Sequence, residues 1–291
     1  MKLNNICVIG MGYVGLTLAV TLAERGFTVH GIEADEKTFK SLNNGVPHFH
    51  EKGIDILLKK HLNSRIFIHK EIPNKKMDVF IICVGTPLDK TTKKPVMKYI
   101  LHATGEVKDK LSDGSLVVLM STVPVGATRS IVKPILDQSG KKYGLAFCPE
   151  RTIEGKALVE LRQLPQIIGG LNEESVDRSL DLFRRVTTTT VEVSSIEAAE
   201  MIKLIDNSFR DLNFAYANEI ALICENLKLD ALEVIKAAGT AYPRTNVPVP
   251  GFVGGSCLEK DPYILFEVAK NNGYVPHLIK NARVVNEIIP S

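Results

Sequence analysis

A glycine-rich turn near the start of the chain constrains the fold more than any other feature. The apolar strand Asn5–Ile9 runs directly into Gly10-Met11-Gly12-Tyr13-Val14-Gly15. A helix predicted over Leu16–Arg25 follows, and a second apolar strand, Phe27–Ile32, leads to Glu33. A GxGxxG turn alone is weak evidence, but this order of elements, with an acidic residue about twenty positions on, is the dinucleotide-binding fingerprint. The alternative is a glycine turn in an α/β protein that binds no dinucleotide.

The same stretch indicates which dinucleotide is bound. Glycines let the backbone approach the pyrophosphate, which rests on the N-terminus of the helix. Glu33 would accept hydrogen bonds from the adenosine ribose and repel a 2′-phosphate, so NAD is favoured over NADP. The positive charge of Lys37 weakens this preference for NAD, because it could pair with a 2′-phosphate. The residues expected to contact the cofactor are Gly10, Gly12, Tyr13, Val14, Gly15, Glu33, Lys37, Thr86 and Thr122.

Further apolar runs predict a parallel sheet. Each of the first three is followed by small or polar residues, and two more strands would complete the sheet: Val79–Val84, Leu116–Met120, Leu145–Cys148, then Gln166–Ile168 and Thr188–Val193. Strands that alternate with helices are typical of a doubly wound α/β fold. We therefore predict a Rossmann-like NAD-binding domain over residues 1–194.

Polar side chains follow these strands. Ligands of a doubly wound sheet bind outside the carboxyl ends of its strands. Thr86 and Thr122 are accordingly expected to offer hydroxyls to cofactor or substrate, and Glu150, Arg151 and Glu154 to face the substrate. For Thr122 a helix N-cap is an equally good explanation.

A second glycine-rich stretch, Gly251–Asp261, contains a cysteine, Cys257. A thiol becomes a nucleophile only as the thiolate, which needs a nearby positive charge, a helix N-terminus or a base. Lys260 supplies a charge, and a helix predicted over Leu258–Asn271 would begin beside the sulfur of Cys257. These features favour a nucleophile over a buried small hydrophobic residue, the usual state of a cysteine outside a disulfide.

A long helix without Pro or Gly is predicted over Ser195–Leu227. At about 100° per residue its two sides differ: Lys203, Asn207, Arg210 and Phe214 lie broadly opposite Met201, Ile205, Phe209 and Leu212. The polar stripe is either a solvated face or, because apolar residues border it, part of a functional site. The apolar side is expected to be buried against the subunit or a twin helix. Residues 195–291 are thus predicted to form a helical central domain.

Composition excludes several classes of function. The 36 basic and 33 acidic side chains are mixed along the sequence, so no nucleic-acid surface is indicated. The five cysteines are widely spaced, without CxxC pairs, which favours reduced thiols in the cytoplasm over disulfides or a metal site. No apolar run approaches the ~20 residues needed to span a bilayer. We expect a cytoplasmic protein without nucleic-acid, membrane or metal partners.

Six motifs, in family order along nearly the whole chain, resemble the UDP-glucose/GDP-mannose dehydrogenase family. They are the glycine turn, Val84-Gly85-Thr86-Pro87, Ser121–Gly126, Cys148-Pro149-Glu150-Arg151, Lys203–Asn207 and Gly254–Leu258. The Cys-Pro-Glu-Arg run, Asn207–Asp211 and Pro243-Arg244 look more like the branch that acts on UDP-N-acetylhexosamines, especially UDP-N-acetylmannosamine, than the UDP-glucose branch.

The resemblance implies a four-electron oxidation of the sugar's C6 hydroxyl to a carboxylate with two NAD⁺. Cys257 would capture the C6 aldehyde as a thiohemiacetal and then carry a thioester that water hydrolyses. Lys203 and Asn207 match the pair that holds the C6 oxygen, and Asp261 the carboxylate beside that lysine. The remaining implied roles are a catalytic water ordered by Glu154 and Thr122, and a UDP-sugar held by Glu150, Arg151, Lys203, Asn207, Arg210, Tyr242, Arg244 and Gly254. The 195–227 helix pairs two subunits in the family, so a homodimer is expected.

Two departures from the family pattern leave alternatives open. Glu259 stands where much of the family has proline, and the family's third domain, which covers the nucleotide, is expected to be absent. The alternatives are a UDP-glucose 6-dehydrogenase, a truncated NAD-binding and dimerisation module without turnover, and a two-electron hydroxyacid dehydrogenase. The last class has no need of the cysteine loop.

Overall fold

The computed structural model describes residues 3–255 and 257–290. It contains two compact units. The first holds the residues up to Thr86 and Val96–Glu200, and the second holds Pro87–Pro95 and the residues from Met201 onward. The division falls within one long helix, and the domain boundary predicted at residues 194–195 stays a prediction.

The first unit is built on an eight-stranded sheet with the order β3-β2-β1-β4-β5-β6-β7-β8. All neighbouring strands are parallel except β6 and β7, which are antiparallel. The strands are β1 (Asn5–Ile9), β2 (Thr28–Ile32), β3 (Ile66–His69), β4 (Val79–Ile82), β5 (Ser115–Leu119), β6 (Tyr143–Phe147), β7 (Gln166–Gly170) and β8 (Thr190–Glu192). This confirms the predicted doubly wound fold.

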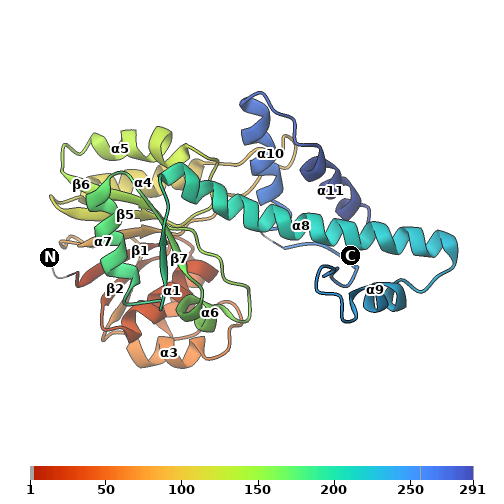
Figure 1. Ribbon diagram of the computed structural model, residues 1–291. Helices are drawn as coiled ribbons and strands as arrows, with labels where there is room; N and C mark the ends of the chain where they lie inside the picture. The colour runs from red at the N-terminus through yellow and green to blue at the C-terminus, as the bar shows by residue number, and fades with distance from the viewer. Residues whose placement is uncertain (1–2, 256, 291) are drawn as a thin grey trace. The chain divides into compact units, whose positions relative to one another are not determined.

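Helices cover both faces of this sheet (Figure 1). They are α1 (Tyr13–Glu24), α2 (Glu36–Asn43), α3 (Ile54–His61), α4 (Lys98–Lys110), the π-helical turn η1 (Thr128–Val132), α5 (Lys133–Asp137), α6 (Ala157–Gln163) and α7 (Glu173–Phe183). Asp35 accepts a hydrogen bond from the Thr38 N–H at the start of α2, and Asn172 does the same for Ser175 at the start of α7. Helix α1 begins at Tyr13, three residues ahead of the predicted Leu16, because the turn itself enters the helix.

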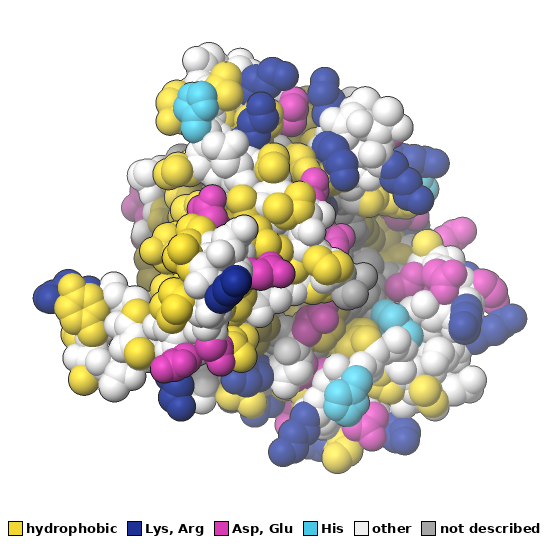
Figure 2. All heavy atoms as spheres, turned by 90° about the vertical axis from the view of Figure 1, so that its right-hand side faces the viewer, with side chains coloured by type: hydrophobic (Ala, Val, Ile, Leu, Met, Phe, Trp, Pro, Cys, Tyr) yellow, Lys and Arg dark blue, Asp and Glu magenta, His cyan; other side chains and the backbone are white. Residues whose placement is uncertain are grey.

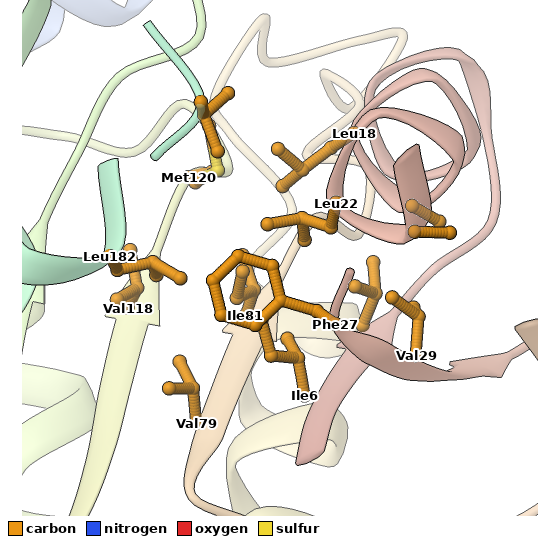
Figure 3. Packing of buried hydrophobic residues seen from close by; sticks show 14 of the residues in the cluster. Ile6, Leu18, Leu22, Phe27, Val29, Val79, Ile81, Val118, Met120 and Leu182 are labelled. Carbon is orange, nitrogen blue, oxygen red and sulfur yellow. The ribbon is translucent and has the colours of Figure 1, made fainter. Parts of the chain in front are cut away.

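The core lies between the sheet and the helices of one face. Phe27, in the turn between α1 and β2, is fully buried among side chains of β1, β4, α1 and α7 (Figure 3). The labelled neighbours are Ile6, Leu18, Leu22, Val29, Val79, Ile81, Val118, Met120 and Leu182. Burying each such side chain stabilises the fold by about 1.5–3 kcal/mol. This packing holds the glycine turn between β1 and α1 in place.

The second unit is helical apart from its loops. Its elements are α8 (Ile196–Leu227), which begins in the first unit, α9 (Ala231–Gly239), α10 (Asp261–Asn271) and α11 (His277–Glu287). The long helix was predicted to within one residue. The segment Pro87–Pro95 forms a tight turn closed by a bridge between Leu88 and Pro95.

The predicted start of a second helix, α10, is also wrong by three residues. Helix α10 begins at Asp261 rather than Leu258, since Pro262 suits a first helical turn and the N–H groups of Lys260 and Asp261 donate to the carbonyl of Cys257. Cys257 therefore lies in a turn ahead of the helix. Helix α9 begins at Ala231, because Asp230 caps it through the N–H groups of Leu232 and Glu233.

None of the helices within residues 3–255 and 257–290 combines the length and apolar character that crossing a bilayer demands.

Candidate active-site residues

The glycine turn joins the end of β1 to the start of α1 and brings the backbones of Gly10 and Gly15 into close contact. Gly10 has φ +90°, which favours glycine, and its N–H donates to the carbonyl of Ile32. A β-carbon at Gly15 would lie 1.9 Å from the carbonyl oxygen of Gly10, so only glycine allows this close approach. A β-carbon at Gly12, by contrast, would meet nothing within 4 Å. The helix N-terminus at Gly12 thus faces open space, which fits a pyrophosphate bound there.

Glu33 directly follows β2, the place that the fingerprint requires. Its side chain is half-buried, and its Oε1 accepts a hydrogen bond from the N–H of Asp35 over 2.8 Å. Lys37 lies in the first turn of α2 and is exposed. Val14, in the first turn of α1, is half-buried.

Tyr13 links the glycine turn to the loop that carries Glu154. Its hydroxyl donates to Oε2 of Glu51 over 2.5 Å and accepts from the N–H of Gly155 over 3.0 Å. Glu51 also accepts from the Gly155 N–H. Burial and the bond to Glu51 raise the pKa of Tyr13. Glu154 itself is exposed.

The ends of β4 and β5 are tied to each other. The Thr86 hydroxyl donates to the Thr122 carbonyl over 2.6 Å; Thr86 is buried and Thr122 half-buried. The loop beyond Thr122 is held by Glu200, a fully buried carboxylate on α8 that accepts from the N–H groups of Gly126 and Thr128 and from the Thr128 hydroxyl. Burial raises the pKa of Glu200 despite these bonds.

Glu150 and Arg151 follow β6. Glu150 is buried and accepts a hydrogen bond from the N–H of Thr152. Arg151 donates from Nη2 to the carbonyl of Pro165 over 2.7 Å. Both side chains thus brace the loop that leads to Glu154.

In the second unit, α8 presents Lys203 and Asn207 as buried side chains, only 6% and 5% exposed. Asn207 donates from Nδ2 to Oδ2 of Asp261 over 2.6 Å, and Lys260 pairs with the other oxygen. Asp261 is fully buried, whereas Cys257, in the turn just before α10, is exposed. An accessible thiol and a buried lysine, amide and carboxylate therefore occur together in this unit.

Three residues predicted to hold the nucleotide sugar, Arg210, Tyr242 and Arg244, lie on the surface of the second unit. Arg210 is exposed. Arg244 and Tyr242 pair with each other, with 3.1 Å between Nε and the hydroxyl and 4.6 Å between the guanidinium and the ring centre. A β-carbon at Gly254 would lie 2.4 Å from the ring of Phe252, so a larger residue there would displace that ring.

Sequence reasoning missed several buried polar residues. Glu51 and Glu200 are examples, as is the pair formed by Asp211 on α8 and Arg283 on α11, 2.7 Å apart. A charged residue in a helical pattern is normally solvated, so the sequence does not indicate that these side chains are buried. For Glu200 the local pattern indicates only a position near a helix start, three residues after Glu197. Among the residues that the structure describes, no three His, Cys, Asp or Glu side chains come together as ligands for a metal ion.

The mostly parallel sheet with its glycine turn defines a dinucleotide-binding protein of the Rossmann type. Residues 4–187 match the NAD binding domain of the UDP-glucose/GDP-mannose dehydrogenase family, and residues 197–288 match its central domain. The chain belongs to this family, and its first unit is the NAD-binding domain.

Two of the similar proteins are named as dehydrogenases of UDP-N-acetylmannosamine. A UDP-N-acetyl-D-mannosamine dehydrogenase of Methanococcus vannielii is 37% identical over 99% of this chain, and the chain spans 66% of that relative's length. The structure of the Pyrococcus horikoshii UDP-D-ManNAc dehydrogenase superposes with a TM-score of 0.91 at 34% identity, covering 97% of this chain and 68% of the other. A 3-hydroxyisobutyrate dehydrogenase of Mycobacterium tuberculosis, 17% identical over 98% of this chain and 93% of its own with a TM-score of 0.70, shares the fold alone.

Proposed function

We propose that this chain carries out the NAD-dependent, four-electron oxidation of the C6 hydroxyl of a UDP-N-acetylhexosamine, UDP-N-acetylmannosamine in the first instance, to the uronic acid. One observation carries the proposal: the hydrogen bond from Asn207 to Asp261, beside the turn of the exposed Cys257. A two-electron hydroxyacid dehydrogenase has no use for such a cysteine. The relatives named as UDP-N-acetyl-D-mannosamine dehydrogenases support the choice of sugar.

The glycine turn, with Gly10, Gly12 and Gly15, would hold NAD, which accepts a hydride from carbon when bound. The alcohol loses a hydride and a proton to give the C6 aldehyde. The Cys257 thiolate then adds to the aldehyde carbon, and the oxygen takes a proton, which gives a thiohemiacetal. Loss of a second hydride and a proton gives the thioester, and water cleaves its C–S bond to release the acid and the thiolate.

Lys203 and Asn207 would stabilise the C6 oxygen. That oxygen bears negative charge when the alcohol or the thiohemiacetal loses its proton and when thiolate or water adds to the carbonyl carbon. A buried ammonium and amide offset such charge better than water does. Asp261 orients the Asn207 amide through the bond to Nδ2. We assign the ordering of the hydrolytic water to Thr122 and Glu154, and recognition of the UDP-sugar to Glu150, Arg151, Arg210, Tyr242, Arg244 and Gly254.

Counting NADH per sugar tests this function. We expect two NADH for each UDP-N-acetylmannosamine consumed and a slower reaction with UDP-glucose. Cys257→Ala should abolish acid formation, whereas Cys224→Ala, which alters a buried cysteine of the same unit, should leave most of it. Acid formed by Cys257→Ala at the parental rate would overturn the mechanism. NAD binding without sugar-dependent NADH would instead identify a non-catalytic module.

The choice of NAD over NADP rests on Glu33. Its carboxylate follows β2, where a 2′-phosphate would meet like charge. Calorimetric titration should show NADP binding at least about tenfold more weakly than NAD, and Glu33→Ala should narrow the gap. Equal binding of the two by the parent would contradict this assignment.

We also infer a homodimer built on α8. Its large apolar side chains recur along one stripe, within about 80° of the helix circumference at about 100° per residue: Met201, Ile205, Phe209, Tyr216, Ile223 and Leu227, all 37–63% exposed. Hydrophobic side chains gather on the side that faces the viewer in Figure 2, at the C-terminal end of α8. Apolar surface of this extent is typical of a protein interface. Since the subunit leaves this stripe open, a second copy of the helix is the partner that we propose.

A further inference from the structure

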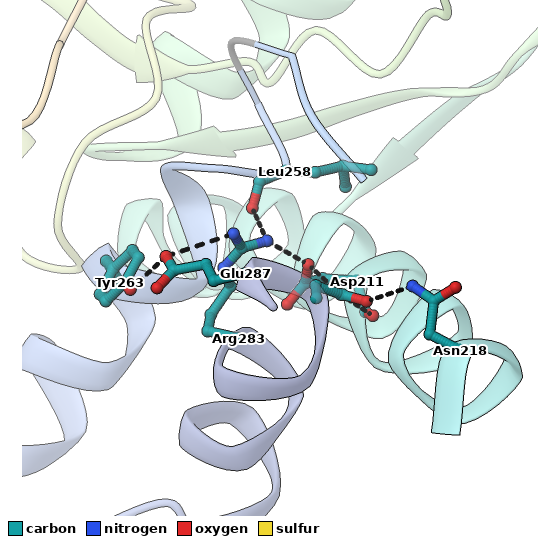
Figure 4. A network of polar contacts seen from close by, with 7 residues as sticks. Asp211, Asn218, Leu258, Tyr263, Arg283 and Glu287 are labelled. Atoms are coloured by element: carbon teal, nitrogen blue, oxygen red, sulfur yellow. Dashed lines mark hydrogen bonds and ion pairs between the residues drawn. The ribbon is translucent and has the colours of Figure 1, made fainter. Parts of the chain in front are cut away.

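Both ends of the loop that carries Cys257 are anchored by side chains outside the proposed catalytic set. The N–H of Gly251 donates to Oδ1 of Asn218 over 2.7 Å. The carbonyl of Leu258 accepts from Nη1 of Arg283 over 3.3 Å (Figure 4). Ser256 lies outside the described residues. The loop is therefore held at its first glycine, Gly251, and at Leu258, just after its cysteine.

The two anchors share one buried support. Asn218 donates from Nδ2 to Oδ1 of Asn286 over 2.9 Å, and Asn286 donates to Oδ1 of Asp211 over 2.9 Å. The same Asp211 oxygen accepts from Nη1 of Arg283 over 2.7 Å. All four side chains are at most 4% exposed. A continuous buried network of this kind permits few alternative geometries.

Two residues of this buried network lie on the same face of α8 as Lys203 and Asn207, the pair proposed to stabilise the C6 oxygen. Lys203, Asn207, Asp211 and Asn218 fall within about 80° of one another around α8, and all are buried. Asn207 adds a third anchor by its bond to Asp261. One face of α8 therefore carries the lysine and the amide, bonds the cysteine segment directly at Gly251 and Asp261, and holds Arg283, which bonds the segment at Leu258.

We propose that Asp211, Asn218, Arg283 and Asn286 are positioning residues that set the place of Cys257 relative to the Lys203–Asn207 pair. The inference rests on the proposed function. Nucleophilic attack requires the reacting atoms at a defined separation, and a displacement of about 1 Å can lower a rate about a hundredfold. A buried ion pair such as Asp211–Arg283 adds little net stability compared with apolar packing, so its value here lies in the geometry that it imposes.

The anchoring is tested by hydrogen exchange of the peptide that spans Gly251–Leu258. Asn218→Leu removes both hydrogen bonds of that side chain and should speed exchange about fivefold, the effect of losing about one hydrogen bond. Asn218→Asp keeps an oxygen for the Gly251 N–H and should restore most of the protection. Asn226→Leu is the matched control, because Asn226 is exposed on the same helix and bonds only to the carbonyl of Leu222.

The positioning role is tested by kinetics. Asn218→Leu should lower kcat about tenfold while the KM values for NAD and sugar stay within about twofold, because binding is kept and alignment is lost. A folded Asn218→Leu variant with the exchange and kcat of the Asn226→Leu control would overturn the proposal. If Asn218→Leu does not fold, Arg283→Lys replaces it, since lysine keeps a positive charge near Asp211 but lacks the planar guanidinium whose Nη1 bonds both Asp211 and the Leu258 carbonyl. Hydrogen exchange can be measured without turnover. A parent protein that forms no NADH would therefore count against the proposed function, while the exchange data would still test the anchoring of the loop.

Discussion

The carbonyl oxygen of Gly10 and the site of a β-carbon on Gly15 lie 1.9 Å apart, which is far inside van der Waals contact. The first turn of α1 therefore packs on the end of β1 through bare backbone. A β-carbon on Gly12, between them, would meet no atom within 4 Å apart from those of Gly12 and its chain neighbours. Two glycines of one motif thus have separate tasks, one in packing and one in leaving room for a ligand.

The first prediction separates these tasks by substitution. Gly15→Ala should lower the melting temperature by about 10 °C or leave insoluble protein, because backbone must move to admit the methyl group. Gly12→Ala should melt like the parent yet bind NAD at least about tenfold more weakly. Circular dichroism melts and calorimetric titration measure the two effects. A Gly15→Ala protein of parental stability would show that the clash relaxes at no cost.

The apolar stripe of α8 supports a prediction about assembly. Phe209, 63% exposed, would bury its ring in the dimer, a contribution of about 1.5–3 kcal/mol. Phe209→Asp should therefore shift a dimer toward monomer in sedimentation at micromolar concentration. Glu225→Lys, a change of charge at an exposed residue on the opposite side of the same helix, serves as the control. An unchanged Phe209→Asp dimer would place the interface on another surface.

Glu200 should matter more for stability than its neighbour Glu197. Glu200→Ala leaves two buried donors of Thr128 and the part-buried N–H of Gly126 without their acceptor, at about 1–3 kcal/mol for each buried group. The melting temperature should therefore fall by more than about 6 °C. Glu197 is partly exposed and pairs with Arg129 at 2.6 Å, so Glu197→Ala should remove less than about 1 kcal/mol. Thermal melts of both variants at neutral pH provide the comparison, and equal losses would refute it.

Acid stability should depend on Glu24. Hydrogen bonds from Lys60 and His61 lower the pKa of Glu24 from its ordinary value to about 2. Because the pKa of Glu24 is lower in the folded protein than in the unfolded chain, its bonds to Lys60 and His61 stabilise the fold above the ordinary pKa of a glutamate. This contribution is lost as the pH falls toward about 2. Solvent screening limits it to about 1 kcal/mol.

Glu24→Gln should accordingly reduce stability at pH 7 and flatten the decline in melting temperature between pH 5 and pH 3. Glu71→Gln, at an exposed glutamate, should change neither. Parallel curves for parent and Glu24→Gln in that interval would contradict the assignment.

Local patterns sufficed to predict most of the first unit. Strand β1, the glycine turn and the strand before Glu33 follow from apolar runs and glycine positions, and these signals need no distant partner. Strand β3 was missed, since Ile66–His69 is a short edge strand in which buried and half-buried residues alternate. The start of α10 was misplaced because Cys257–Lys260 adopts a turn held by hydrogen bonds to the Cys257 carbonyl.

The phase of the polar stripe on α8 was not predictable from composition alone. Arg210 was assigned to it, but Arg210 is exposed and the adjacent Asp211 is buried. Whether a charge on a helix is buried depends on what packs against it, and the partner of Asp211 is Arg283, 72 positions along the chain. The helical period indicates which residues share a face but not which face is covered.

The assignment of Pro87–Pro95 to the second unit means that no single cut can separate the two. The chain enters that unit at Pro87, leaves it at Pro95 and returns at Met201. Lys93, whose ammonium lies 5.4 Å from the ring centre of Tyr263 on α10, would stay behind if the chain were cleaved after Glu200. During translation this short segment must also wait, unpartnered by its own unit, until the ribosome has made α10.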